Sequence, residues 1–483
     1  MKKFIIVFSI ILLTINNLFA DSGKARFHVI IDTDCAPDDL RAISLMLASS
    51  DFEILAITTS DGILKPKEGY IKIKSLLKEF GHEGIPVAYG EDINSEKSIH
   101  HSTCINIAWG KDQNIILPQN SLASDLIINE INNEKEMVIL LCLGPLTNII
   151  DIISIAEIKP QLDKVLWYCD DIENRKGANF EIDTLSAKSF IESDIEKYIV
   201  SNNNLKNMVF DNNILTDIGK IKNVYTQNIL ISHSHTEFMN KINSGDIKIW
   251  DDLLPLYLLC PELFITNTLR NNTYKISPNS NSTEQIKNNI LKFLKLDYSK
   301  ENQVFNNFPI HPELYADDLK DKVVNIIEKF GISEWRAGVL TNELHGHLGI
   351  YAILGVKMGL RVRQYYNIGV DDIKITSFAG SKPPISCFND GLQVSTGGTL
   401  GHGLITISDE DIKRPEAIFQ FKTKKVKLRL KNKYWKIIRT NVKEGITKYG
   451  NLTPEYWQHI RILAINYWSK WDRTEIFDII TEF

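Results

Sequence analysis

Short runs of apolar residues alternate with segments of helical periodicity through the first half of the chain. Runs that are apolar at nearly every position are typical of parallel strands covered by helices on both faces. They predict a doubly wound α/β domain with a mostly parallel sheet over residues 27–315. The predicted strands are Phe27–Ile31, Ile54–Thr59, Ile85–Tyr89, Met137–Leu143 and Lys164–Tyr168.

The pattern changes after about Phe264, where Asn and Ser become frequent. A second, C-terminal α+β domain is predicted beyond this point. Lys425–Lys431 alternates strictly between basic and apolar residues, which predicts an antiparallel strand at a solvated sheet edge. The predicted divisions are a linker helix at 316–334, the second domain at 335–440 and a helical extension at 441–483.

The first residues differ from the rest in composition. Lys2 and Lys3 precede the apolar stretch Phe4–Leu13, and the small residue Ala20 stands at a cleavage position. This pattern is typical of a secretory signal peptide, here residues 1–20, and a buried first strand is the alternative. The apolar stretch is too short to span a membrane comfortably, so no transmembrane segment is expected after cleavage. We therefore expect an exported protein, periplasmic or extracellular.

Composition narrows the range of partners. A chain of 483 residues is too long for one ordinary domain, and 43% apolar residues suffice for conventional cores. The net charge of −5 provides no general attraction to nucleic acid. The six cysteines match neither a zinc-binding spacing nor a disulfide framework, so mostly free thiols are expected. The sequence is compatible with a homo-oligomer.

The acidic segment Asp32–Asp39 is the most informative part of the sequence. It contains four carboxylates, which repel one another strongly unless a cation lies among them. Because only oxygen ligands are offered, a hard ion such as Ca²⁺ is favoured. The segment joins a strand to a helix, where open α/β sheets build their sites. An acidic helix N-terminus would account for Asp38 and Asp39 but not for Asp32 and Asp34.

This segment is the first of five blocks of sequence that occur in a characteristic order. They are Asp32–Asp39, Ala56–Thr59, Gly84–Gly90, Leu143–Asn148, and Trp250–Asp252 followed by Pro261–Phe264. Each block alone is a weak signal, but their common order over about half the chain is specific. Residues 27–265 resemble the inosine–uridine preferring nucleoside hydrolase family.

This resemblance implies Ca²⁺-dependent hydrolysis of the N-glycosidic bond of a ribonucleoside, which gives free base and ribose. It implies that Asp34, Asp39 and Asp251 bind Ca²⁺ through their side chains and Leu143 through its carbonyl oxygen. The reaction passes through an oxocarbenium-like transition state. Asp34 would be the general base for the attacking water, which the ion acidifies. Asp38 is placed to accept a hydrogen bond from a ribose hydroxyl.

The chain departs from the family at several positions. Cys35-Ala36 replaces the usual Pro-Gly, and Gly62-Ile63 replaces the usual Gly-Asn. Around Phe180, Asn179 and Glu181 have exchanged the places of the family's amide and acid. In an extended segment both side chains would share a face and reach a ribose. A non-catalytic nucleoside- or ribose-binding protein that retains the metal site is therefore the alternative.

Two tryptophans replace family histidines. Trp250 precedes Asp251, where a histidine often serves the departing base, and Trp109 stands in a loop that resembles a His-Gly pair. Aromatic rings at such positions favour stacking on a flat base, and the resemblance then implies a preference for purines. Packing in the core is the alternative for both rings.

Four further residues carry potential ligands in the second domain: His345, His347, Cys387 and His402. With the surrounding glycine-rich loops, they resemble a domain family that takes its name from a component of formylmethanofuran dehydrogenase. Gly349 and Gly398 stand where that family commonly has cysteines. The four remaining residues form a candidate Zn²⁺ site. A dimerisation or regulatory module, whose histidines only form hydrogen bonds, is the alternative.

Overall fold

The computed structural model describes residues 25–483 except 97, 113, 120–121, 202–207, 271, 296–303, 306, 371–372 and 412. The predicted signal peptide lies outside the described residues. Among the helices that are described, none is long and apolar enough to cross a membrane.

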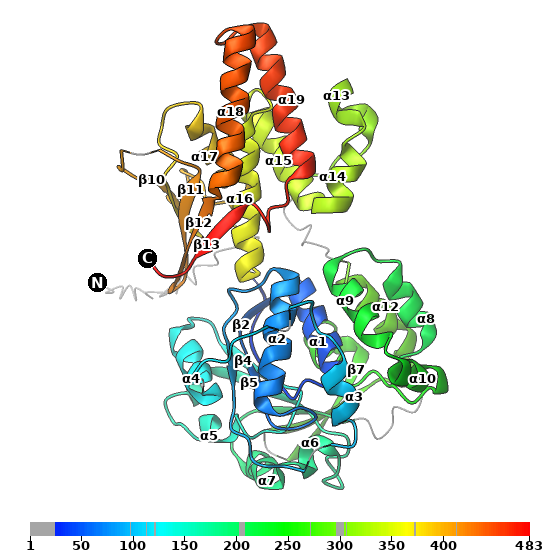
Figure 1. The fold of residues 1–483 in the computed structure, drawn as a ribbon. Helices are drawn as coiled ribbons and strands as arrows, with labels where there is room; N and C mark the ends of the chain where they lie inside the picture. Colours follow the sequence, from blue (N-terminus) through cyan, green and yellow to red (C-terminus); the bar gives the residue numbers. More distant parts are fainter. Residues whose placement is uncertain are drawn as a thin grey trace, which may run out of the picture.

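The first half of the chain forms an eight-stranded sheet in the order β3-β2-β1-β4-β5-β6-β8-β7 (Figure 1). All neighbouring strands are parallel except β7 and β8, which pair antiparallel. The doubly wound prediction is therefore confirmed, and each of the five predicted strands is present. The strands are β1 (Phe27–Thr33), β2 (Phe52–Thr59), β3 (Val87–Tyr89), β4 (Val138–Cys142), β5 (Leu162–Tyr168), β6 (Lys197–Val200), β7 (Phe264–Arg270) and β8 (Thr273–Pro278).

Helices cover both faces of this sheet, and each face has its own apolar core. One face packs against α1 (Pro37–Ala48), α2 (Pro66–Phe80), α8 (Asn212–Gly219), α9 (Val224–His233), α10 (Thr236–Ser244), α11 (Leu253–Leu259) and α12 (Thr283–Phe293). The other packs against α4 (Ala123–Asn133), α5 (Ile150–Ile153) and α7 (Thr184–Glu192). The short helices α3 (His101–Asn106) and α6 (Ala178–Glu181) lie in loops after β3 and β5. Burial on both faces explains why the strands are apolar throughout.

The second half of the chain forms a separate α+β unit with a five-stranded sheet, β10-β9-β11-β12-β13. The long helix α16 (Ile350–Tyr366) is largely buried and packs on α15, α17 and α19. The strands are β9 (Lys374–Ser377), β10 (Ile405–Ile407), β11 (Glu416–Phe421), β12 (Lys424–Leu430) and β13 (Phe477–Ile480). The other helices are α13 (Asp317–Lys320), α14 (Val323–Phe330), α15 (Ile332–His345), α17 (Phe388–Thr396), α18 (Asn432–Tyr449) and α19 (Pro454–Lys470).

The structure changes the predicted divisions of the second half. Strand β13 pairs with β12, so residues after 440 complete the second sheet instead of forming an extension. Helices α13 and α14 contribute Leu319 and Phe330 to the same core, so 316–334 is part of the unit and not a free linker. Strand β12 lies between β11 and β13, so its prediction as an edge strand was wrong. Lys425, Lys427 and Arg429 lie on the partly exposed face of this inner strand.

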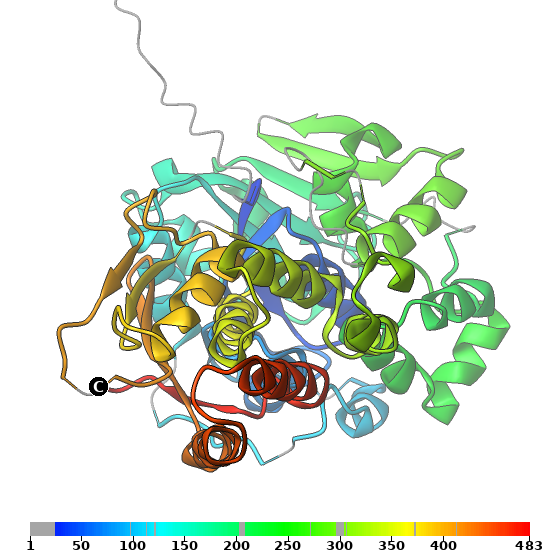
Figure 2. The ribbon, with the colours of Figure 1, turned by 90° about the horizontal axis from the view of Figure 1, so that it is seen from above.

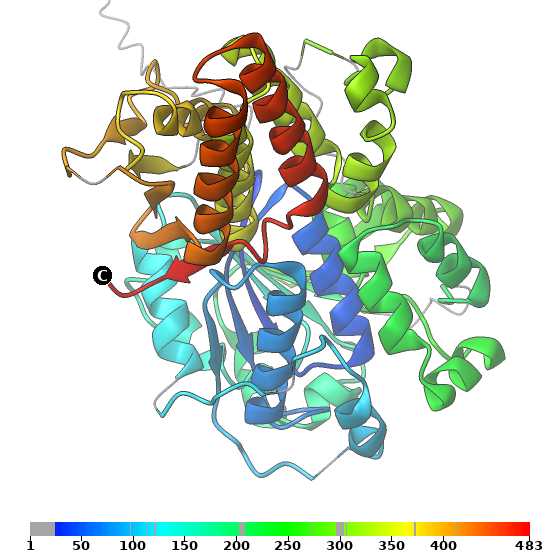
Figure 3. The ribbon, with the colours of Figure 1, turned by 45° about the horizontal axis from the view of Figure 1, so that its top comes forward.

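The second unit rests on the amino ends of the strands of the first sheet (Figures 1 and 3). Arg361 of α16 donates to the Gly81 carbonyl at 2.8 Å and to Glu83 at 2.8 and 2.9 Å. The Gly84 amide donates to the Tyr365 carbonyl at 2.9 Å. Seen from above in Figure 2, α18 and α19 (orange and red) point nearly along the view, away from the first sheet.

A cation on the turn between β11 and β12 completes this contact. Lys422 pairs with Glu53 and Glu134 of the first unit. His28 lies 3.5 Å from each of the two carboxylates. The group resembles a cation site, but the ammonium of Lys422 already contacts both carboxylates, so we interpret the group as part of the contact between the units.

Candidate active site

The acidic segment lies at the carboxyl end of β1, on the edge of the sheet opposite the second unit. Cys35 adopts a left-handed conformation with φ 64°, which turns the chain sharply between β1 and α1. Its amide donates to Thr33 Oγ1 at 2.9 Å and to Asp39 Oδ2 at 3.0 Å. This turn brings Asp34 beside the first residues of α1, where Asp38 and Asp39 lie.

Asp32 has a structural role and does not join the cluster. Its Oδ1 accepts hydrogen bonds from Thr58 Oγ1 at 2.6 Å and from Asn148 Nδ2 at 2.8 Å. Complete burial raises the pKa of this carboxyl to about 7. Through Oδ1, Asp32 thus ties β1 to β2 and to the loop after β4, while its Oδ2 is buried without a hydrogen-bond partner.

Three carboxylates converge although they come from distant parts of the chain. Asp38, Asp39 and Asp251 each offer an oxygen, and these oxygens lie within 4.8 Å of one another. Asp39 Oδ1 and Asp251 Oδ1 are buried and have no hydrogen-bond partner. Buried carboxylate oxygens are rarely left unpaired, so these two atoms fit a cation that accepts oxygen ligands.

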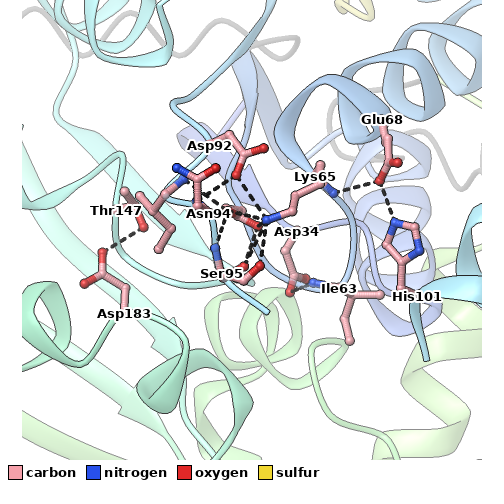
Figure 4. A network of polar contacts seen from close by, with 12 residues as sticks. Asp34, Ile63, Lys65, Glu68, Asp92, Asn94, Ser95, His101, Thr147 and Asp183 are labelled. Carbon is pink, nitrogen blue, oxygen red and sulfur yellow. Dashed lines mark hydrogen bonds and ion pairs between the residues drawn. The ribbon is translucent and has the colours of Figure 1, made fainter. Parts of the chain in front are cut away.

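Asp34 is held from the side of the loop after β2 (Figure 4). Its Oδ2 accepts a hydrogen bond from the Ile63 amide at 2.8 Å. A Cβ atom at Gly62 would lie only 2.1 Å from this oxygen, so the loop approaches Asp34 as closely as it does only because residue 62 is glycine. The isoleucine in place of the family's asparagine therefore contributes its backbone rather than a polar side chain.

The carboxylates of the cluster repel one another. Burial, and then repulsion by Asp39, raises the pKa of Asp34 well above its usual value. Burial and repulsion by Asp38 and Asp39 do the same for Asp251. For Asp38 and Asp39, burial is the largest cause of a pKa raised to about 6. A divalent cation would relieve both effects, because its charge favours the ionised carboxylates.

The carbonyl of Leu143 lies at the end of β4 beside β1, and the Leu143 amide donates to the Asp32 carbonyl at 2.8 Å. Asn179 Nδ2 donates to this Leu143 carbonyl at 2.6 Å. A carbonyl oxygen has two lone pairs, so the bond leaves one for a cation. Asn179 therefore touches a predicted ligand, and its contact with a ribose stays a prediction.

Glu181 does not share that position. Residues 178–181 form the one-turn helix α6, not the extended segment that the sequence suggested. Positions two apart in a helix point roughly 200° away from each other. The Glu181 side chain is exposed and accepts a hydrogen bond from the Gly177 amide at 3.4 Å. The expectation that both side chains share one face was wrong.

The two tryptophans occupy different environments. Trp250 is half-buried, directly precedes Asp251, and has a buried indole nitrogen without a hydrogen-bond partner. Trp109 is 1% exposed and packs in the apolar core between the sheet and the helices on its α2 side. Its ring has no open face, so the expectation that Trp109 stacks on a base is not met. Trp250 is adjacent to the cluster, and its contact with a base stays a prediction.

A network around the site was not foreseen from the sequence (Figure 4). Lys65 pairs with Asp61 at 3.0 Å and with Asp92 at 3.1 Å, and donates to the Ser95 carbonyl at 3.0 Å. It joins the loops after β2 and β3, which both lie at the carboxyl edge. Beside it, His101 contacts Glu68 at 2.8 Å. Because most of these partners are about 30 residues apart, no local motif indicates them.

The predicted ligands of the second unit are only partly brought together. The rings of His345 and His347 lie 4.3 Å apart, and Asp390 contacts His345 Nδ1 at 2.8 Å. His402 is exposed, with Nδ1 3.2 Å from the Gly397 carbonyl. Among the described residues, no three of the predicted ligands gather closely enough to hold one ion. The four-residue Zn²⁺ site is therefore not formed as predicted. All six cysteines are free thiols, which agrees with the sequence-based expectation.

The first unit is similar in sequence to curated ribonucleoside hydrolases. Residues of this chain are 29% identical over 145 residues to the pyrimidine-specific ribonucleoside hydrolase RihA of Shewanella baltica, covering 29% of this chain and 46% of that protein. They are 32% identical over 127 residues to RihA of Shewanella woodyi, covering 25% and 40%. The chain thus spans less than half the length of these curated relatives.

Solved structures with a similar fold include a plant nucleoside hydrolase, the PpNRh1 enzyme, at 17% identity and a TM-score of 0.48, covering 56% of this chain and 99% of that one. A purine-preferring ribonucleoside hydrolase from Gardnerella vaginalis matches at 17% identity and a TM-score of 0.46, with the same coverage. Residues 344–478 match the family described as FmdE, molybdenum formylmethanofuran dehydrogenase operon, which confirms the second resemblance. Over residues 29–316, more than half its length, the chain matches and belongs to the inosine-uridine preferring nucleoside hydrolase family.

Proposed function

We propose that this protein hydrolyses the N-glycosidic bond of ribonucleosides to free base and ribose, and that Ca²⁺ is the required ion. The convergence of Asp38, Asp39 and Asp251, with two buried oxygens unpartnered, carries the proposal. Asp34 and the Leu143 carbonyl complete the set. All of these ligands are oxygen atoms, which Ca²⁺ prefers.

The residues divide the chemistry among them. A bound divalent cation supplies Lewis acidity toward water and a positive charge among the carboxylates. Asp34, oriented by the Ile63 amide, takes the proton of the attacking water. Asp38 is the partly exposed member of the cluster and accepts a hydrogen bond from a ribose hydroxyl. Burial of the site keeps these charges effective in a medium of low dielectric constant.

The base lies against Trp250 in this proposal, and purines are preferred because their larger ring system stacks better. The names of the relatives favour neither class of base, because they include pyrimidine-specific and purine-preferring hydrolases. Trp250→Ala should raise KM more for inosine than for uridine. An equal effect on the two nucleosides, or faster cleavage of uridine by the wild-type chain, would contradict the purine preference.

The deciding experiment is release of free base from inosine, adenosine, guanosine, uridine and cytidine, with and without a chelator. The proposal expects turnover that EDTA abolishes and Ca²⁺ restores. Binding of nucleosides without any release of base would instead support the alternative, a nucleoside-binding protein that retains the metal site. We further propose export, which the N-terminal residue of the mature protein in the periplasmic or culture fraction would test.

In the second unit we propose a smaller Zn²⁺ site at His345 and His347. His345 Nε2 is buried without a hydrogen-bond partner. A Cβ atom at Gly349 would lie 3.5 and 3.6 Å from Nε2 of the two histidines, so both nitrogens face the place where the family commonly has a cysteine. Elemental analysis of the purified protein, compared with a His345→Ala/His347→Ala variant, tests this site. Equal zinc contents would refute it.

A further inference from the structure

A buried ion pair joins the two chain segments that carry the carboxylates. Arg41 lies one turn after Asp38 in α1, and Asp252 directly follows Asp251. Arg41 Nε donates to the two oxygens of Asp252 at 3.1 and 3.2 Å, and Nη2 donates to Oδ2 at 2.9 Å. The two side chains are 2% and 0% exposed. The pair therefore connects α1 to the turn before α11 directly beside the cluster.

The rest of the guanidinium group is also fixed. Nη2 donates to the Lys248 carbonyl at 3.0 Å, and Nη1 lies 3.1 Å from His233 Nε2. The hydroxyl of Ser232 donates to a backbone carbonyl of its own helix and therefore accepts from His233 Nδ1 at 2.8 Å. His233 Nε2 is then the acceptor for Arg41. The ring of Phe210 lies 4.3 Å from the guanidinium carbon.

Stability alone is a weak reason for such a pair. Removing two charges from water costs about as much as their attraction returns, and apolar residues of similar volume often serve a fold equally well. The planar fork of arginine, however, fixes both the distance and the orientation of a carboxylate. Because the pair is neutral as a whole, it can orient the neighbouring acids without changing their summed charge.

We propose that the Arg41–Asp252 pair positions the cation ligands: it holds the Trp250–Asp252 turn against α1, so that the Asp251 carboxylate faces those of Asp38 and Asp39. Arg41 and Asp252 are positioning residues, since neither is a ligand. The inference rests on the cation site of the proposed function and concerns how that site is kept in shape. Partners that orient ligands are typically worth about 10- to 100-fold in metal affinity.

The test uses the full chain with Arg41→Leu/Asp252→Leu, which removes both charges together. We expect metal-free melting close to that of the wild type, a Kd for Ca²⁺ at least about tenfold higher by titration calorimetry, and a lower kcat. Arg41→Lys keeps the charge but cannot form the fork, so it should also weaken Ca²⁺ binding, and it serves if the double variant does not fold. Lys357→Met/Glu334→Leu removes a buried ion pair of the second unit and is the matched control, with unchanged Ca²⁺ affinity expected.

Wild-type Ca²⁺ affinity in a folded Arg41→Leu/Asp252→Leu or Arg41→Lys variant would overturn the proposal. An equal loss of affinity in the Lys357→Met/Glu334→Leu control would also overturn it, because general destabilisation would then suffice. A wild-type chain that binds no Ca²⁺ removes this inference together with the metal site. A wild-type chain that binds Ca²⁺ but releases no base from any ribonucleoside refutes only the proposed function.

Discussion

Replacing Gly62 by alanine should disable the site by displacing Asp34. The added Cβ would lie 2.1 Å from Asp34 Oδ2, about 0.9 Å short of the 3.0 Å below which such contacts essentially do not occur. Asp34 cannot yield freely, because the Ile63 amide holds the same oxygen at 2.8 Å. A misplacement of about 1 Å in a catalytic group can cost about 10²-fold. We therefore expect Gly62→Ala to lower kcat/KM for ribonucleosides about 100-fold and to weaken Ca²⁺ binding.

The assay measures base release, Ca²⁺ affinity and thermal unfolding on the same preparation. Overpacking of this kind costs about 1–3 kcal/mol of stability, so the variant should remain folded. Gly401→Ala is the matched control, since its Cβ would meet only Thr399 Oγ1 at 3.8 Å. A folded Gly62→Ala protein with kcat/KM within a fewfold of the wild type would refute the assignment of Asp34 as a group that must stay in place.

Three other changes test the same structure. Asp34→Asn should leave the fold intact and lower kcat roughly 10²- to 10⁴-fold, and wild-type base release would remove the proposed mechanism. Ca²⁺ should bind about tenfold more weakly at pH 5 than at pH 7 for each proton displaced, since burial raises the pKa of Asp38 and Asp39 to about 6; equal Kd values would contradict this. The stability of the metal-free protein should change with pH in the opposite direction. The native state binds these protons more tightly than the unfolded chain, so the free energy of unfolding should fall as pH rises from about 4 to 6. Arg361→Ala should lower the free energy of unfolding by about 1–3 kcal/mol, because the buried Gly81 carbonyl loses its donor, and leave kcat/KM unchanged; lost turnover would show that the units are coupled.

The fold of the first unit was predictable because its strands are buried on both faces, which gives each a continuous apolar run. The boundaries of the second unit were not predictable from the sequence. Strand β13 is four residues long and pairs with a strand about 50 residues earlier, and no local pattern indicates that pairing. The same applies to α14, whose apolar residues identify a buried face but not the core against which it packs.

The site was predictable where one segment holds several of its groups and less so where the groups are distant. Asp34, Asp38 and Asp39 stand together in the sequence, and Asp251 was found only through resemblance. The number of acids in the segment was misleading for Asp32, because the sequence does not show that Thr58 and Asn148 would hold its Oδ1 away from the cluster. The Arg41–Asp252 pair spans 211 positions and was invisible for the same reason.

The arrangement of the two units bears on what the second one does. The carboxylate cluster lies at the carboxyl end of β1, whereas His28 and the partners of Lys422 lie at its amino end, about 20 Å away by strand length. None of the ligands proposed for this cluster, which all precede residue 252, comes from the second unit. The contact buries His82 and Arg361, and each of them hydrogen-bonds to the opposite unit, as is typical of a permanent interface. This geometry favours a role of the second unit in stability, assembly or regulation, with the chemical step confined to the first.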